Sequence, residues 1–309
     1  MVDVSVIICT HNPRPQYLGR VLGALRSQSL PMEQWELLVI DNASQEPLTT
    51  GAWDLSWHPY ARLIREEELG LSAARMRGMR EAAAALFVFV DDDNVLDPAY
   101  LSEALRIANE WPQLGVWGGS VIHEYEIQPS SDLHEFIGAL GLRDVKSPHW
   151  SNVMTCSDAL PIGAGLCLRA AVGAAYTENF AKTDVQLSDR RGASLMSGGD
   201  FDICYYACHL GFGMGLFPEL KLTHLIPKER IDEQYLVKIT EGIHVSLFLL
   251  RYKWLGMHPP SYITVSGILR FIRDCFRFRG LRRRTYLAEV RAANIANRII
   301  DASRNTFIA

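Results

Sequence analysis

The sequence predicts an α/β fold with a Rossmann-like, mostly parallel sheet flanked by helices and a helical C-terminal extension. Two observations lead to this prediction. Short runs of β-branched and aromatic residues alternate with segments of helical periodicity over residues 4–110. These runs are apolar along their whole length, as strands covered on both faces of a parallel sheet are. With 309 residues, 48% of them hydrophobic, the chain can bury a core of this kind.

The expected elements follow in chain order. Strands are expected at 4–9, 35–40, 61–64 and 86–90. Helices are expected between and after them, at 17–25, 71–85 and 98–110. Beyond residue 111 we expect strands at 115–125 and 217–225, a Gly-rich segment that turns apolar at 161–169, and a helix at 201–210. From residue 231 the pattern is helical to the end, with a break at 256–260. We therefore predict a sheet domain over 1–230 and a helical region over 231–309.

Positive charge is concentrated near the C-terminus. Nine arginines lie between Ile268 and Arg298 against Asp274 and Glu289, so this stretch carries a net charge of +7 while the whole chain carries −4. Apolar residues interleave with these arginines, which predicts a basic amphipathic helix that could lie on an anionic membrane. The alternative is a helix packed on the protein with its arginines in solvent. No nucleic-acid recognition motif accompanies them, so we expect no nucleic-acid partner.

The cysteines and the hydropathy pattern bear on the compartment. Six cysteines are scattered without a CxxC pair, and the N-terminus lacks the pattern of a signal peptide. No apolar run of about 18 residues predicts a spanning helix. We expect reduced thiols in a cytoplasmic protein, peripheral at the inner face of the membrane if the basic segment binds lipid.

Three consecutive carboxylates follow the apolar run 86–90. Asp91, Asp92 and Asp93 repel one another, and their charge is best tolerated beside a cation. Oxygen ligands suit Mg²⁺ or Mn²⁺, and such ions are commonly shared with phosphate oxygens. The alternative is a solvated acidic turn or a helix-capping cluster. A cation site is favoured because the triplet lies where a buried strand is expected to end.

Polar residues also end two neighbouring strands. Thr10 and Asp41 follow the runs 4–9 and 35–40. Ligands of open α/β sheets bind outside the carboxyl ends of the strands. We therefore expect Thr10, Asp41 and Asp91 to meet at one edge of the sheet.

Two candidates lie much later in the chain. Asp200 follows two glycines and opens an apolar helix, so it is either a helix cap or, if it faces the acidic edge, a general base. His224 ends the run 217–225 and is either a hydrogen-bonded structural residue or a nitrogen ligand that Mn²⁺ tolerates.

Six ordered segments resemble motifs of the family 2 inverting glycosyltransferases, which have the GT-A fold. The similarity spans about residues 4–226. The segments are VSVIICTHNP, WELLVIDNAS, GLSAARMRGMREA, FVFVDDDNVLDPAYL, PIGAGLCLR and SGGDFDICYYACHLGFGMGLFPELKLTH. The resemblance implies a nucleotide-binding half at about 1–115 and an acceptor half at about 116–230.

The resemblance implies donor-binding functions in the first half. Thr10, Asn12 and Asp41 would bind the nucleotide of a nucleotide-sugar donor. Arg75 would orient the donor phosphates or the aspartates. Met76 stands where the family usually has asparagine, so the match is weaker in this segment.

The resemblance also assigns the reacting end of the site. Asp91 and Asp92 would contact the donor, and Asp93 and His224 would hold a divalent metal, Mn²⁺ or Mg²⁺. Asp200 would be the catalytic base. Gly199 replaces the acidic residue that often precedes this base, so the motif keeps one carboxylate.

The implied reaction is transfer of a sugar to an acceptor hydroxyl with inversion, by a single displacement. Negative charge develops on the departing diphosphate, where a metal and an arginine would stabilise it. One base on the opposite face of the sugar would activate the hydroxyl. A UDP-sugar is favoured, with GDP- and dTDP-sugars open. The acceptor would be carbohydrate or lipid-linked, as in the synthesis of cell-envelope polysaccharides, glycolipids or other glycoconjugates.

Two other classes of protein remain open. A sugar-nucleotide nucleotidyltransferase has a similar sheet and acidic site, but it would be expected to have a Gly-rich basic loop where this chain has THNPRPQ. A non-catalytic binding protein on the same scaffold would not need Asp91, Asp93 and Asp200 together.

Overall fold

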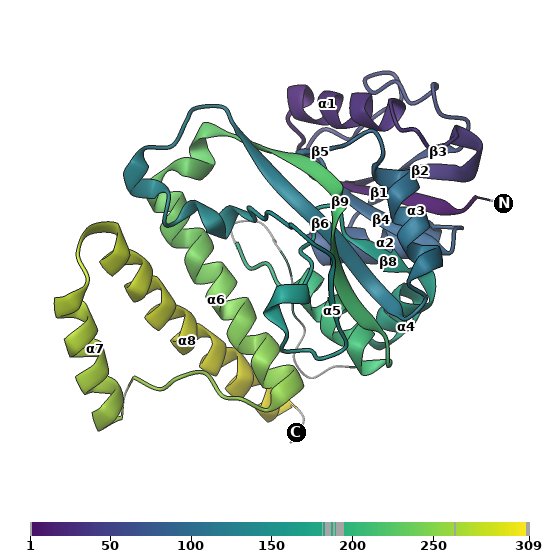
Figure 1. Ribbon diagram of the computed structural model, residues 1–309. Coiled ribbons are helices and arrows are strands. Elements are labelled where there is room, and N and C mark those ends of the chain that lie inside the picture. Colours follow the sequence, from purple (N-terminus) through teal and green to yellow (C-terminus); the bar gives the residue numbers. More distant parts are fainter. Residues whose placement is uncertain are drawn as a thin grey trace.

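The computed structural model of the protein describes residues 2–180, 182, 187, 189, 195–262 and 264–306. Within these residues one nine-stranded sheet has the order β3-β2-β1-β4-β8-β6-β9-β5, and β7 pairs with β9 (Figure 1). The strands are β1 (Val4–Thr10), β2 (Trp35–Asn42), β3 (Ala61–Glu66), β4 (Leu86–Asp91), β5 (Asn94–Leu96), β6 (Leu114–Tyr125), β7 (His149–Ser151), β8 (Cys167–Arg169) and β9 (Gly213–Ile226).

Helices surround this sheet and extend the chain. They are α1 (Pro15–Arg26), α2 (Leu71–Glu81), α3 (Tyr100–Glu110), α4 (Ala170–Phe180), α5 (Gly199–His209), α6 (Glu233–Leu255), α7 (Val265–Arg277) and α8 (Gly280–Thr306). Two short 3₁₀ helices matter for the site, η3 (Ile137–Leu140) and η5 (Lys228–Ile231).

The expected parallel core is confirmed. Strand β1 pairs in parallel with β2 and β4, and β2 with β3. The sheet becomes mixed at β8, which is antiparallel to both β4 and β6. Alternate residues of each strand enter two separate cores: Val4, Val6 and Ile8 pack under α1 and α3, whereas Ile7 and Cys9 pack under α2, α4 and α5. Both faces of the sheet are therefore covered, which explains why its strands are apolar throughout.

Some expected boundaries move for local reasons. Helix α2 ends at Glu81 rather than at residue 85, because the backbone N–H groups of Ala83 and Ala84 donate to Glu36 and Ser5 of the sheet. Strand β9 starts at Gly213, four residues before the apolar run, because its first part pairs with both β6 and β7.

The sheet ends at Ile226 and the C-terminal helices begin at Glu233, near the change expected at residue 230. Asp232 caps α6 by accepting from the backbone N–H groups of Gln234 and Tyr235. Helices α6 and α8 pack through a shared apolar core, and α7 lies on the outer side of α8 (Figure 1). Within the described residues no helix is both long enough and apolar enough to cross a bilayer.

Candidate functional site

A cleft of about 670 Å³ opens at the carboxyl ends of β1 and β4. We call one part of its wall the polar half; it contains Thr10, His11, Asn42, Arg75, Asp91, Asp92, Asp93, Asp200, His224 and Arg230. We call the other part the apolar half; it contains Leu140, Leu142, Leu160, Ile162, Phe201, Ile239, Ile243 and Leu247. Most of the candidate residues therefore meet in one cleft, although they come from distant parts of the sequence.

The ends of β1 and β4 meet as expected. The hydroxyl of Thr10 donates a hydrogen bond to a carboxylate oxygen of Asp92. Burial raises the pKa of Asp92 to about 7, and the neighbouring carboxylates Asp93 and Asp91 act in the same direction. Asp91 lines the cleft beside them. The three carboxylates thus form a buried acidic edge that favours a cationic or proton-bearing neighbour.

Asp41 and Asn12 lie next to the cleft in a network of loop hydrogen bonds. The carboxylate of Asp41 accepts from Leu48 N at 3.0 Å and from the Arg65 guanidinium at 2.7 Å. Burial raises its pKa, but these hydrogen bonds and those from Ser44 lower it more. The side chain of Asn12 accepts from Gln45 N at 2.9 Å.

The residue after Asp41 lines the cleft instead. Asn42 presents its side chain there, held by donation to Glu68 O at 2.7 Å. A nucleotide contact of Asp41 or Asn12 stays a prediction.

Arg75 is a buried cation surrounded by carboxylates. Its guanidinium donates to Asp189 at 3.0 Å, and both side chains are almost fully buried. Burial lowers the pKa of Arg75, but Asp189, Asp91 and Asp200 raise it more. A charge buried in this way needs such partners, because an unpaired buried ion is strongly destabilising. Arg75 is therefore fixed between the acidic triplet and Asp200.

Asp200 lies in the first turn of α5. Asp189 accepts from Gly198 N at 2.9 Å and Gly199 N at 2.8 Å at the start of this helix. The carboxylate of Asp200 accepts from Phe201 N at 2.9 Å in the same turn and from Gly163 N at 2.7 Å across the cleft wall. Burial raises its pKa, against the lowering effect of Arg75. Asp200 thus satisfies one N–H of the helix start and also lines the cleft as a carboxylate with enhanced basicity.

The first glycine of the segment PIGAGLCLR, Gly163, is required for a steric reason. A Cβ atom at Gly163 would lie 2.5 Å from Nη2 of Arg75 and 3.3 Å from the Asp200 carboxylate. Any side chain here would push the arginine or the aspartate away, so glycine lets the backbone N–H reach Asp200.

The second aspartate of α5 has a structural function. Asp202 is fully buried and accepts from Tyr176 Oη at 2.9 Å, Lys253 Nζ at 2.7 Å and Trp254 Nε1 at 2.7 Å. It therefore ties α5 to α4 and to the end of α6, on the side of α5 away from the cleft.

Asp93 and His224 are brought together by the pairing of β5 with β9. Oδ2 of Asp93 lies 3.4 Å from Nε2 of His224. Arg230 of η5 donates to the same oxygen at 2.9 Å and lies 3.2 Å from the same nitrogen. Burial lowers the pKa of Arg230, but Asp93, Tyr235 and Asp92 together raise it more. A guanidinium therefore lies at the point where the expected metal ligands converge.

The donor atoms fit a divalent ion that is shared with a substrate. Within the described residues no group of three or more His, Cys, Asp and Glu side chains is arranged to hold a metal. Asp93 and His224 supply one oxygen and one nitrogen, a pair that Mn²⁺ accepts. Ions at phosphate sites often take one or two protein carboxylates and complete their shell with phosphate oxygens and water. The pair can serve this purpose if Arg230 moves away.

Two important residues were not among the candidates from sequence. Asp189 lies in a segment without a motif, and Arg230 follows the last strand in a short 3₁₀ helix. Only Arg230 could have been picked out from the sequence, because it is a basic residue shortly after the candidate His224. Neither contact could be inferred, because Asp189 and Arg230 meet residues 114 and 137 positions away.

Comparison with known proteins agrees with this geometry. Residues 5–157, about half of the chain, match the model of Glycosyl transferase family 2. The chain is 35% identical over 92 residues to glycosyltransferase AglE of Haloferax volcanii, covering 29% of this chain and 30% of that protein. It is 35% identical over 160 residues to the dolichol-phosphate mannosyltransferase of Pyrococcus furiosus, covering 48% and 44%. The matches thus span less than half the length of these curated relatives.

A solved structure extends the similarity to the whole fold. The crystal structure of S. aureus TarS 1-349 in complex with UDP superposes with a TM-score of 0.53 at 12% identity, covering 99% of this chain and 92% of that one. The sheet topology and the family match agree. The chain has the GT-A fold and belongs to glycosyl transferase family 2.

Proposed function

We propose that this protein is an inverting glycosyltransferase that moves a sugar from a nucleoside-diphosphate sugar to an acceptor hydroxyl, with Asp200 as the base. The main support is that Asp200 lines the same cleft as the Asp91–Asp93 triplet, with the buried Arg75 between them. A base and a diphosphate site on one cleft are what a single displacement requires.

The donor would bind in the polar half. Thr10, Asn42 and the acidic triplet line it, and Arg75 supplies a buried positive charge. UDP is the favoured nucleotide, because the similar TarS structure was solved in complex with UDP. We further propose that Asp41 contacts the base once the 43–48 loop adjusts, with Asn12 beside it.

The protein groups have separable tasks in the reaction. Arg75 attracts the diphosphate, whose negative charge grows as the sugar leaves. Asp93 and His224 would hold a divalent cation, which when bound supplies further positive charge to the leaving group. Asp200 accepts the proton of the acceptor hydroxyl, and its raised pKa favours that transfer near neutral pH.

The acceptor would lie against the apolar half. Ile239, Ile243 and Leu247 come from one face of α6, and Leu140 and Leu142 from η3 and the residues that follow it. A polar sugar chain alone would leave this surface without a matching partner. We therefore propose an acceptor with an apolar portion, such as a lipid-linked glycan intermediate.

Incubation with a panel of nucleotide sugars and Mn²⁺ or Mg²⁺ tests the activity. Release of nucleoside diphosphate, with a product of inverted anomeric configuration when an acceptor is present, is the expected result. Exchange of pyrophosphate instead would indicate a nucleotidyltransferase. Binding of nucleotide without turnover of any donor in the panel would indicate a non-catalytic protein.

A further inference from the structure

Helix α7 exposes a continuous apolar stripe. Phe276, Val265 and Leu269 are 84%, 76% and 64% exposed, and Ile268 and Ile272 are also exposed. Counted from Val265, these five positions follow the i, i+3, i+4, i+7 and i+11 spacing of one helix face. Scattered exposed apolar residues are ordinary, but a row of five large ones along one helix face indicates a surface that a membrane or another protein covers.

The opposite face of α7 holds the helix in place. The ring of Phe271 stacks on Tyr286 of α8 with centroids 6.4 Å apart, and Phe278 lies 5.3 Å from the same ring. Gly267 and Asp274 are buried on this side. The apolar residues that the sequence interleaves with arginines thus divide into an inward set and an outward stripe. The stripe is not needed to pack α7 onto the protein.

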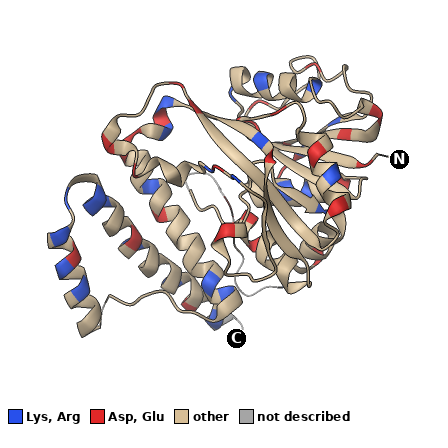
Figure 2. Cartoon of the chain, viewed as in Figure 1, with Lys and Arg blue, Asp and Glu red and all other residues tan. Residues whose placement is uncertain are grey.

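Arginines lie along one side of the stripe. Arg270, Arg273 and Arg277 share one flank of α7, and Arg279, Arg282, Arg283 and Arg284 follow at the junction with α8 and in its first turn. Figure 2 shows basic residues along α7 and at its junction with α8. Asp274 is the one acidic residue of α7, and it is paired with Arg273 at 2.7 Å. The surface therefore has an apolar face with strong positive charge along one side and at the C-terminal end of α7.

We infer that α7 and the start of α8 dock this protein on the surface of an anionic lipid bilayer, with the stripe among the lipids and the arginines at the phosphates. An apolar face flanked by arginines is the pattern of helices that lie in the plane of the interface. Anionic lipids attract each such arginine. A second copy of this surface is a poorer occupant, because two clusters of arginines would then face each other and repel.

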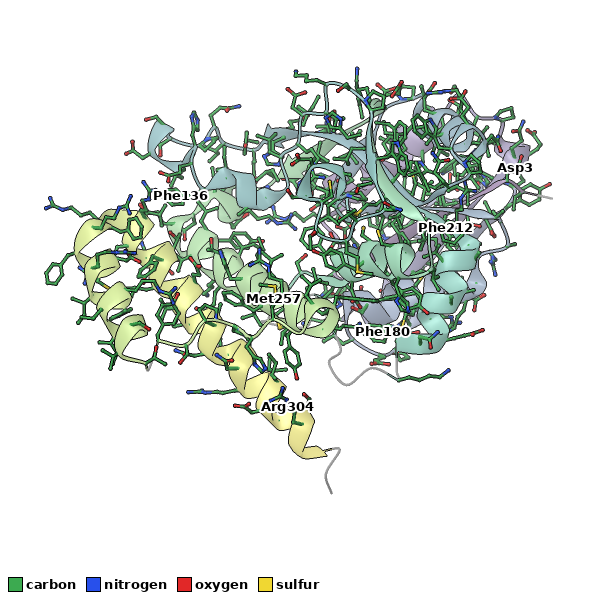
Figure 3. All side chains as sticks on the ribbon, turned by 60° about the horizontal axis from the view of Figure 1, so that its bottom comes forward. Asp3, Phe136, Phe180, Phe212, Met257 and Arg304 are labelled. Atoms are coloured by element: carbon green, nitrogen blue, oxygen red, sulfur yellow. The ribbon has the colours of Figure 1, made fainter. Side chains whose placement is uncertain are left out.

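The start of α8, which adjoins the docking surface, contacts two segments next to residues that line the cleft. Arg282 is 3.6 Å from Glu135, which precedes η3, and Arg284 is 2.6 Å from Glu233 at the start of α6. Figure 3 shows Phe136, which directly precedes η3, near the end of the helical region where α7 is followed by α8. Both η3 and α6 line the apolar half. If the proposed function holds, the sugar end of a lipid-linked acceptor would reach Asp200 while its lipid end stays in the bilayer.

Co-sedimentation of the full chain with vesicles tests the docking without any donor or acceptor. Wild-type protein is expected to bind vesicles of phosphatidylcholine mixed with phosphatidylglycerol, weakly or not at all to phosphatidylcholine alone, and less as salt is raised. Leu269→Ser with Phe276→Ser should abolish the binding. Arg279→Gln with Arg283→Gln should weaken it by roughly five-fold for each arginine.

Matched controls keep the outcome clear. Tyr60→Ser with Val153→Ser removes two comparably exposed apolar residues of the sheet domain, and Arg26→Gln with Arg80→Gln removes two exposed arginines there. Both controls should bind vesicles like wild type.

Docking would be overturned by wild-type protein that stays in the supernatant, or by equal losses of vesicle binding in test and control variants. It would also be overturned if the α7 variants only converted a dimer to a monomer in sedimentation velocity. Nucleoside-diphosphate release from a soluble acceptor assay is independent of vesicles, so a failed proposed function would be recognised separately.

Discussion

The two halves of the cleft are built in different ways. In the polar half, Thr10, Asn42 and the acidic triplet come from the ends of adjacent parallel strands, where strand pairing alone brings Thr10 and Asp92 into contact. Arg75, Asp200 and Arg230 reach the same half from α2, α5 and η5. The apolar half comes from η3, the 160–164 segment, α5 and α6, which come together only through contacts between distant parts of the chain. We infer that the strand-end part of the proposed donor site is set by the sheet, and that the proposed acceptor site depends on how the C-terminal helices pack. Variants that affect one half without the other test this separation.

The largest expected effect is that of Asp200→Asn, in the polar half. Removing the base should lower kcat by roughly 10²- to 10⁴-fold. The affinity for UDP should stay close to wild type, because Asn can still accept from Gly163 N. Steady-state kinetics and calorimetric titration with UDP measure the two quantities. Asp158→Asn, an exposed aspartate on another segment, is the control and should be neutral in both. Near-normal turnover of the Asn variant would remove Asp200 as the base.

Arg75→Met tests the charge balance of the polar half. The substitution leaves Asp189 and Asp200 buried without their cation, which should lower the free energy of unfolding by roughly 3–5 kcal/mol. Donor binding should be lost along with stability. Urea denaturation and UDP titration at low temperature measure these changes. The exposed Arg80→Met on the same helix should change neither, and a stable Arg75 variant with intact UDP affinity would contradict the proposed position of the diphosphate.

Arg230→Gln sharpens the interpretation of the metal ligands. The guanidinium competes with any cation at Asp93, through a charge-assisted hydrogen bond, so its removal should tighten Mn²⁺ binding by roughly ten-fold. Electron paramagnetic resonance of free Mn²⁺ gives the affinity without turnover. Exposed Arg26→Gln should leave it unchanged. Weaker Mn²⁺ binding in the Arg230 variant would mean that the arginine supports the ion rather than excludes it.

An effect of about the same size as that of Arg230→Gln is expected in the apolar half. Ile243→Ser with Leu247→Ser should raise KM for an acceptor with a lipid portion by roughly ten-fold, because an apolar side chain at a half-buried site contributes about 1–2 kcal/mol at most to binding. UDP affinity should not change. Lys238→Ser, on the exposed side of α6, is the control. A parallel loss of UDP binding would break the separation of the halves, since it would show that α6 also shapes the donor site.

The residues that could be predicted from sequence are those whose position follows from local pattern. The acidic triplet follows a buried run, so its place at a strand end was predictable, and the structure confirms the parallel core around it. Asp200 was predictable as a residue that opens α5, but its contact with Gly163 N was not. That contact joins two segments 37 residues apart.

By itself, then, the sequence determined which strands are buried on both faces and which side chains stand at their ends, because a two-residue or 3.6-residue period is a local property. The tertiary structure alone decided which of those side chains share a cleft. It placed Arg230 on Asp93, directed Asp41 into its loop, and turned one apolar face of α7 to solvent. These outcomes follow from contacts between distant segments, where packing and charge pairing select one arrangement out of many that the local pattern allows.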